Sequence, residues 1–269
     1  MKFKYYLLNI LFPLFNFLNI KKKCNFRILM LHCIKKENFK LLENNLKALK
    51  YSYNFIDPNK LSKHYYPASK NNLLLTFDDG FKSNFFFANK VLKKLEIKGI
   101  FFVISDLVNS RNKKKKIIIQ NIFPNKKIFN FSTYHSMSWS DLRKLEKMGH
   151  VIGSHTKSHL NLNNINSQSI LEEQITSPIK TFKKNKIKKP LFFAYSFGNF
   201  YSFNQKCFKI ATKNYRFIFS GIRGDNSKFN KMLYRDNIED NYSFQMINFF
   251  ISGYSDFLYK KFRKIFSSF

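Results

Sequence analysis

The sequence predicts an α/β fold built from parallel β/α units, and two patterns indicate it. Short apolar runs alternate along the chain with longer segments in which apolar residues recur at helical spacing. Strands that are buried on both faces read as continuous apolar runs, and such runs alternating with helices are typical of a parallel sheet. With 44% hydrophobic residues and only 8 Gly and 6 Pro, the 269-residue chain can order itself and bury a full core.

The expected elements follow one another in that alternation. Strands are expected at 26–31, 73–77, 100–104, 151–152, 191–195 and 217–219. Helices are expected at 38–50, 84–95, 140–148, 167–182 and 204–212, with a further outer helix from Tyr242 onward. His150 follows a helix end, where a cation is favoured, and is expected to be structural. Residues 110–135, which include a lysine run at 113–116, break the rhythm and are interpreted as an inserted loop or cap.

Residues 1–23 form a segment of their own, in which an apolar stretch precedes three lysines. The stretch is interrupted by Asn and Pro, is shorter than the roughly 20 apolar residues that a membrane span needs, and is not followed by a small-residue cleavage site. Two interpretations stay open: a helix lying in the membrane interface, or a helix covering one end of the domain. Residues 24–269 are expected to form one domain. We expect a membrane-associated or cytoplasmic protein, with the side of the membrane left open.

The chain carries a formal charge of +32, which raises the question of a nucleic-acid partner. Of its 48 basic residues only seven are arginine, the side chain that makes bidentate contacts with bases and phosphates. Lysine, Asn, Phe, Ile and Tyr are abundant together, as an AT-rich genome would produce, and no nucleic-acid-binding motif is present. We therefore expect no nucleic-acid partner, although the basic surface would favour peripheral contact with an anionic membrane. The three cysteines have neither metal-site nor disulfide-framework spacing.

Two clusters of polar residues follow expected strands. Asp78-Asp79-Gly80 comes directly after the strand at 73–77, and His155 and His159 follow the strand at 151–152. The carboxyl ends of parallel strands are where β/α folds assemble their active sites. One carboxylate and two imidazoles would give a divalent metal three protein ligands and leave a position open, which is a catalytic arrangement. Each cluster alone also has an ordinary structural explanation, a turn or a chance His pair.

These residues also carry a family resemblance. The segments 76–80 (TFDDG) and 155–159 (HTKSH) resemble the motifs of the polysaccharide deacetylases, the NodB-homology carbohydrate esterases. Residues 27–32 (RILMLH) resemble the first strand of a circularly permuted subgroup that includes poly-N-acetylglucosamine deacetylases. Residues 99–103, 138–155 and 193–198 resemble further family motifs, so that the similarity covers roughly 26–255.

The resemblance implies a distorted (β/α) barrel of the NodB-homology type. It implies metal-dependent removal of N-acetyl groups from a polysaccharide or a glycan precursor, such as a surface polysaccharide or a cell-envelope sugar. Carried over residue by residue, the metal ligands would be Asp79, His155 and His159, and the divalent metal is usually zinc.

The resemblance also assigns roles around that metal. Asp78 would be the general base and His32 the general acid. A backbone N–H near Phe197 would stabilise the oxyanion, and Tyr195 of the same motif would lie on the substrate side.

The chain departs from the family pattern at two places near these residues. Ala194 stands where many relatives have the arginine that orients the base, and Ser196 stands where proline is usual. Arg235 resembles part of a downstream motif and is expected to orient Asp78 instead. The departures leave the ligands and the base in place, so we expect an active enzyme. The alternative is a non-catalytic glycan-binding protein on the same fold.

Overall fold

The computed structural model describes residues 26–61, 71–125, 127, 131, 134–227 and 232–266. The segment 1–23, for which the sequence predicts an interfacial or covering helix, lies outside the described residues. Within the described ranges, no helix is both long enough and apolar enough to cross a membrane.

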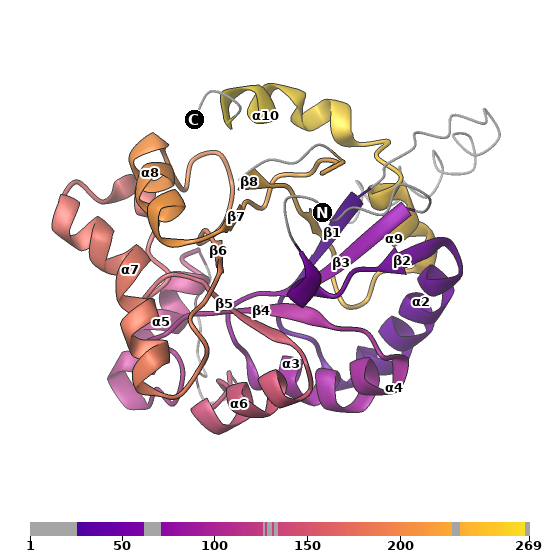
Figure 1. Cartoon of the computed structure of the whole chain (residues 1–269), viewed down its shortest axis with the longest axis horizontal. Coiled ribbons are helices and arrows are strands. Elements are labelled where there is room, and N and C mark those ends of the chain that lie inside the picture. Colours follow the sequence, from indigo (N-terminus) through magenta and orange to yellow (C-terminus); the bar gives the residue numbers. More distant parts are fainter. Residues whose placement is uncertain are drawn as a thin grey trace.

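One parallel sheet forms the centre of the molecule (Figure 1). Its strands run in the order β8-β7-β6-β5-β4-β3-β1-β9, and β2 pairs with the beginning of β3 beside β4. The strands are β1 (Phe26–Leu31), β2 (Tyr53–Phe55), β3 (Asn71–Phe77), β4 (Gly99–Val103), β5 (Val151–Ser154), β6 (Phe192–Ala194), β7 (Phe217–Phe219), β8 (Met232–Leu233) and β9 (Asp236–Asn237). All six predicted strands are present, within one or two residues at most ends.

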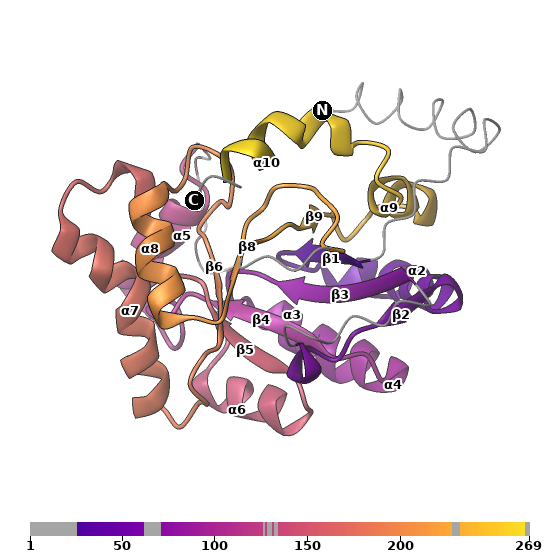
Figure 2. The ribbon, with the colours of Figure 1, turned by 45° about the horizontal axis from the view of Figure 1, so that its top comes forward.

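Helices surround the strands, as the alternating pattern predicts (Figure 1). They are α2 (Phe39–Ser52), α3 (Lys82–Phe87) continued through the π-helical turn η3 (Ala88–Leu92) into α4 (Lys93–Leu95), α5 (Asn112–Ile122), α6 (Trp139–Lys147), α7 (Gln168–Lys184), α8 (Gln205–Asn214), α9 (Phe244–Ile251) and α10 (Lys260–Phe266). Short 3-10 turns are η1 (Lys36–Asn38), η2 (Pro58–Lys60), η5 (Leu162–Asn164) and η6 (Asp256–Tyr259). The C-terminal helices α9 and α10 lie outside the strands, as expected (Figure 2).

The sheet curls until its two edges meet. Strand β8 pairs with β7 at one edge and β9 pairs with β1 at the other, yet only Tyr234 and Arg235 separate β8 from β9 along the chain. Because each residue spans at most about 3.6 Å, the two edges must lie close together. The predicted distorted (β/α) barrel is therefore confirmed, and the joint between its edges carries Arg235.

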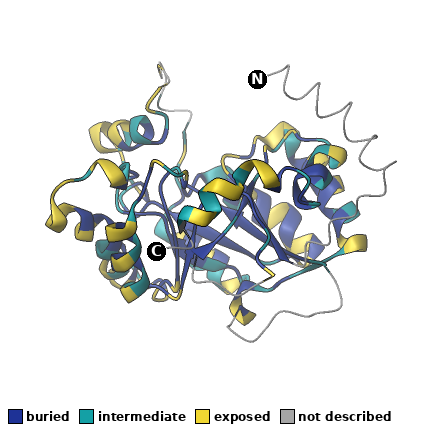
Figure 3. Ribbon diagram, turned by 90° about the horizontal axis from the view of Figure 1, so that it is seen from above, coloured by how far each residue is buried: buried dark blue, intermediate teal, exposed yellow. Residues whose placement is uncertain are grey.

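Alternation along the strands separates the barrel's inside from its outside. Every second residue points inward, where Phe, Ile and Leu side chains from six strands form an interior cluster. The other face packs against the helices in two outer clusters. The strands are therefore buried on both sides, whereas the helices expose their outer faces (Figure 3). This double burial is why the strands read as continuous apolar runs in the sequence.

A buried ion-pair network fastens the last strand to the first. Arg27 on β1 donates to both carboxylate oxygens of Asp236 on β9 and to Asp256 in η6. Arg27 and Asp236 are fully buried. Since Asp236 follows Arg235 directly, the network fixes the position at which Arg235 enters the barrel.

The structure adds detail to two predictions. Residues 110–135, expected as an inserted loop or cap, contain helix α5, which buries Ile118, Ile119 and Ile122 and turns most of its lysines to solvent. His150, expected to be structural, is buried, and its Nδ1 accepts a hydrogen bond from the Gly99 N–H at 3.1 Å. Burial and the neighbouring Lys98 lower the pKa of His150 to about 4, so its ring is neutral near pH 7.

Candidate active site

The turn after β3 aims two adjacent carboxylates in different directions. Asp78 continues the inward-facing set of Leu74 and Thr76, and so its side chain enters the barrel. Asp79 and Gly80 adopt left-handed backbone conformations, with φ of 72° and 85°. This conformation suits glycine and is tolerated by aspartate, and it reverses the chain within two residues. Both carboxylates are buried, at 2% and 1% exposure.

Arg235 contacts Asp78 in a bidentate ion pair. The Nη1–Oδ1 and Nη2–Oδ2 distances are 2.7 and 2.9 Å. The guanidinium is fully buried; it also donates to the Ser220 carbonyl and to the Thr76 hydroxyl, and it lies 5.2 Å from the centre of the Phe102 ring. Two parallel hydrogen bonds fix both the position and the plane of the Asp78 carboxylate.

Asp79, His155 and His159 converge on one point. Asp79 Oδ1 lies 3.6 Å from the Nε2 atoms of both histidines, and the three potential ligand atoms are within 4.8 Å of one another. The structure therefore brings the three predicted ligands together, with Asp78 Oδ2 3.8 Å from His155 Nε2.

The residues present fit a divalent cation. Asp79 Oδ1 is buried and has no hydrogen-bond partner among the described residues. Burying an ionised carboxylate in this way costs free energy unless a cation binds the oxygen. The Nδ1 atoms of His155 and His159 face the Ala194 and Asn121 backbone carbonyls at 3.0 and 3.4 Å. Because a carbonyl only accepts, each Nδ1 carries the proton and each Nε2 keeps its lone pair for a metal.

The pKa values of the two carboxylates shift in opposite directions. Burial would raise the pKa of Asp78, but the ion pair with Arg235 outweighs that effect, and the pKa lies below the usual value. Burial raises the pKa of Asp79, and the neighbouring Asp78 charge raises it further. Burial and the nearby His155 lower the pKa of His159 to about 3. Asp78 is thus stabilised as an anion by protein groups, while ionised Asp79 lacks an equivalent partner.

A pocket of about 430 Å³ opens over these groups. The predicted residues His32, Asp78, Asp79, His155, His159 and Phe197 all line it. Its outer wall comes from the end of α5 and from Tyr134. A small molecule reaching Asp79 would therefore also meet His32 and Phe197.

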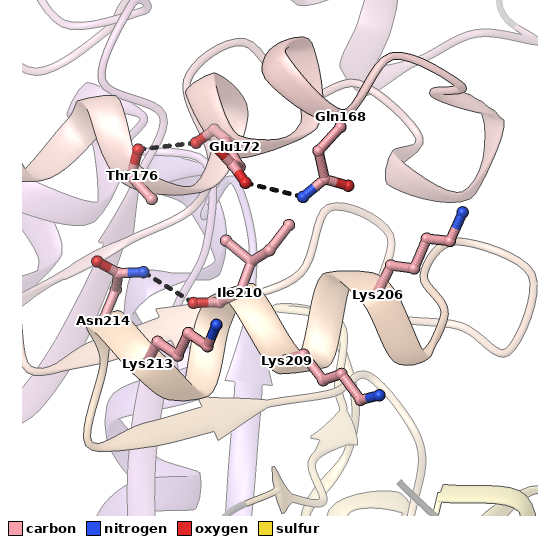
Figure 4. Close-up of a pocket in the computed structure, with 8 residues that line it drawn as sticks. All are labelled: Gln168, Glu172, Thr176, Lys206, Lys209, Ile210, Lys213 and Asn214. Atoms are coloured by element: carbon pink, nitrogen blue, oxygen red, sulfur yellow. Dashed lines mark hydrogen bonds between the residues drawn. The ribbon is translucent and has the colours of Figure 1, made fainter.

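Another hollow, of about 420 Å³, lies between α7 and α8 (Figure 4). It contains none of the predicted site residues. Its three lysines, Lys206, Lys209 and Lys213, extend in different directions and do not converge on a common point (Figure 4). This hollow does not resemble a reaction centre.

Comparison with known proteins gives the family of the chain. The family model for polysaccharide deacetylase matches residues 65–215, more than half of the chain. The chain belongs to the polysaccharide deacetylase family. The matched span contains both carboxylates and both histidines, whereas His32 and Arg235 lie outside it. No curated protein sequence matches the chain.

Solved structures of polysaccharide deacetylases share the fold. The Streptococcus pyogenes deacetylase PplD, solved in complex with acetate, has a TM-score of 0.65 at 20% identity, covering 84% of this chain and 97% of that one. IcaB from Ammonifex degensii has a TM-score of 0.66 at 19% identity, covering 86% and 98%. The de-N-acetylase from Aggregatibacter actinomycetemcomitans has a TM-score of 0.63 at 17% identity, covering 84% and 99%.

Within this polysaccharide deacetylase, the side chains of the 193–198 motif point to opposite sides of the sheet. Tyr195 is fully buried in the outer cluster, where its ring stacks on Phe203 at 3.9 Å, and its backbone N–H donates to the Phe219 carbonyl. Its side chain therefore does not reach the pocket, contrary to the substrate-side position that the motif suggests. Phe197 does line the pocket, at φ 60°, and its backbone N–H has no acceptor among the described residues.

Several contacts near the site were not predicted from the sequence. The Asn121 and Ala194 carbonyls act through backbone atoms, which no side-chain pattern reveals. The hydroxyl of Ser196, at the usual proline position, is hydrogen-bonded to the hydroxyl of Thr156 at 3.0 Å. This hydrogen bond links the loop that carries the two histidines to the segment after β6. The spacing of the isoleucines in α5 was an available signal for the helix that brings Asn121 to His159.

Proposed function

We propose that this polysaccharide deacetylase is a metal-dependent hydrolase that removes N-acetyl groups from a glycan. The observation that carries the proposal is the convergence of Asp79, His155 and His159 beside an Asp78 held by Arg235. A purely glycan-binding protein has no need of a buried cation site next to an oriented carboxylate.

The donor set favours zinc. Two imidazole nitrogens and one carboxylate oxygen are a common zinc ligand set, and three protein ligands leave a position for water or substrate. A divalent cation bound there would acidify water from a pKa of ~15.7 towards ~7 and polarise the acetyl carbonyl.

The chain's own groups would then move the protons. Asp78, kept anionic by Arg235, would take a proton from the attacking water as general base. His32, at the end of β1 on the same pocket, would give a proton to the departing amine as general acid. Cleavage of the C–N bond by water would leave acetate and a free amine on the sugar.

The backbone N–H of Phe197 is the proposed oxyanion donor. It faces no other acceptor among the described groups, and a rigid donor placed where negative charge develops stabilises the transition state. The Ser196 departure from proline leaves this donor intact, since it does not depend on the side chain at 196.

The proposed substrate is an N-acetylated sugar of a surface polysaccharide, a cell-envelope glycan or a glycan precursor. Family membership and the acetate-bound relative PplD support removal of acetyl groups. We further propose that the protein works at or near a membrane surface, because the basic excess would attract anionic lipids.

The test is acetate release from N-acetylglucosamine oligomers by purified protein loaded with Zn²⁺. Chelation should abolish release and added Zn²⁺ should restore it, and His155→Ala should be inactive. The matched control is Lys157→Ala in the same loop, whose side chain pairs with Glu173 at the surface and should leave release intact.

The proposal fails if metal-loaded protein releases no acetate from any N-acetylated glycan in an assay where a known deacetylase works. If that inactive protein still bound glycans, a non-catalytic glycan-binding function would replace it.

A further inference from the structure

The loop that carries the two histidines is held by amide side chains from two helices. Asn121, near the end of α5, donates through Nδ2 to the Ser158 carbonyl at 2.9 Å. Gln174, on α7, accepts through Oε1 from the N–H and from the hydroxyl of Ser158, both at 3.1 Å. We propose that Asn121 and Gln174, which we call the amide clamp, are positioning residues that hold His159 in place for the divalent cation. This inference rests on the proposed function and adds which side chains outside the ligand set determine the affinity for the cation.

The backbone of His159 needs support from its surroundings. Its φ is 60°, and the φ of Thr156, at the start of the same turn, is 64°. Residues other than glycine occupy this left-handed region only rarely, because the Cβ atom crowds the backbone there. Ser158 lies directly before His159, and the clamp binds both its N–H and its carbonyl. The clamp therefore fixes the two peptide planes around Ser158, of which the second leads into His159.

Asn121 also contacts the imidazole itself. Its backbone carbonyl faces Nδ1 of His159 at 3.4 Å, while its side chain binds the Ser158 carbonyl. The His159 ring is only 4% exposed and lies edge-on to the Phe197 ring, with ring centres 4.7 Å apart. A hydrogen bond to the second ring nitrogen fixes the orientation of a histidine ligand. Both the backbone and the ring of His159 thus depend on Asn121.

The proline inside α7 frees a backbone group for the same loop. Pro178 has no N–H, so the Gln174 carbonyl, four residues earlier, lacks its usual helical donor. The Lys157 N–H donates to this carbonyl at 2.9 Å instead. Gln174 therefore holds the loop by its main chain as well as by its side chain.

The packing of the two helices does not depend on the amides. The three isoleucines of α5 join an apolar cluster with Phe81 and Ile104, and α7 packs through Leu171 and Ile175. Gln174 is nevertheless only 4% exposed, and burying an amide costs free energy unless it is hydrogen-bonded. The hydrogen bonds of the clamp go to the histidine loop and order it before the cation arrives. A site formed in advance loses less conformational entropy on binding, which favours affinity.

The experiment measures the affinity for Zn²⁺ alone, by competition with a chromogenic chelator. Asn121→Leu removes the donor and Gln174→Met removes the acceptor, each with little change of size, and each should weaken zinc binding about 10- to 100-fold. Gln174→Glu keeps an oxygen acceptor of the same reach and should bind zinc more tightly than Gln174→Met. The matched control is Gln168→Met on the same helix, whose side chain donates to Glu172 at the surface and which should bind zinc as the wild type does.

Urea denaturation of the metal-free proteins and acetate release from N-acetylglucosamine oligomers are measured for the same variants. The inference is overturned if Asn121→Leu and Gln174→Met bind zinc as tightly as Gln168→Met, or if Gln174→Glu binds it no better than Gln174→Met. Lower stability of the metal-free variants with unchanged zinc affinity would also overturn it, since the clamp would then support only the fold.

The zinc and acetate measurements separate this inference from the proposed function. If zinc affinity depends on the clamp but no acetate is released, the clamp stands and the proposed catalytic function fails. If acetate is released but zinc affinity does not depend on the clamp, the proposed function stands and the clamp fails.

Discussion

Replacing Arg235 with methionine should destabilise the fold by leaving the Asp78 carboxylate charged in a buried position. The substitution keeps a long apolar side chain but removes both hydrogen bonds to a carboxylate that is only 2% exposed. With the charge centres about 4 Å apart and an effective dielectric constant of about 20, the lost attraction is about 4 kcal/mol. This value agrees with the 3–5 kcal/mol, roughly, that breaking one side of a buried ion pair costs.

The paired variant separates this effect from a simple loss of packing. In Asp78→Asn/Arg235→Met no charge remains unpaired, so the double variant should lose less stability than the two single losses added together. We expect a coupling free energy of about 3 kcal/mol. The free energy of unfolding is measured by urea denaturation followed by circular dichroism, with a chelator present so that bound metal does not contribute.

The matched control is the surface pair of Lys157 and Glu173. Its N–O distance is as short, at 2.6 Å, but its side chains are 30% and 51% exposed. Exposed pairs contribute at most about 1 kcal/mol, so the cycle of Lys157→Met and Glu173→Gln should show a small coupling. Losses at Asp78 and Arg235 that add to within about 0.5 kcal/mol would refute the reasoning that burial makes this pair strong.

Two further predictions concern other buried groups. His150 has a pKa of about 4 when folded, so the unfolded chain binds more protons between about pH 4 and 6.5, and stability should fall by up to about 3 kcal/mol as pH drops through that range. Urea denaturation at pH 7.5 and 4.5 should show a smaller drop in the free energy of unfolding for His150→Gln than for the wild type. An equal drop in the two proteins would contradict the low pKa of His150. Asp236→Asn removes the carboxylate charge next to the fully buried Arg27, which keeps its ion pair with Asp256, and should cost roughly 1.5–3 kcal/mol of unfolding free energy. Because Arg235 directly precedes β9, acetate release should fall with it, and a variant as stable as the wild type would show that the network is dispensable.

The barrel was largely predictable because its strands are buried on both faces and stand out as apolar runs. Strands β8 and β9 were not predictable: each has two residues, too few to show a period, and pairing with β7 and β1 defines them. The helix α5 was obscured by its lysine run, although Ile118, Ile119 and Ile122 mark its buried face.

The ligand cluster was predictable because Asp and His side chains at strand ends signal a site by their chemistry. The sequence placed Asp79 with His155 and His159, and the structure brings the three together. The position predicted for Tyr195 was wrong because a motif does not say to which side of the sheet a side chain points. Ala194, the last residue of β6, faces the barrel interior, whereas Tyr195, the next residue, faces the helices. The partners of the two histidines are backbone carbonyls, so only the folded chain identifies them.

The proposed function gives Asp78 and Asp79, adjacent in sequence, different roles: base and metal ligand. The most direct test is to measure zinc content and acetate release side by side for Asp78→Asn and Asp79→Asn. We expect Asp78→Asn to bind one zinc per chain, as the wild type should, and to release acetate about 10²- to 10⁴-fold more slowly. Asp79→Asn should lose the zinc as well as the activity. An Asp78→Asn protein that keeps its activity, or an Asp79→Asn protein that keeps both zinc and activity, would contradict these roles.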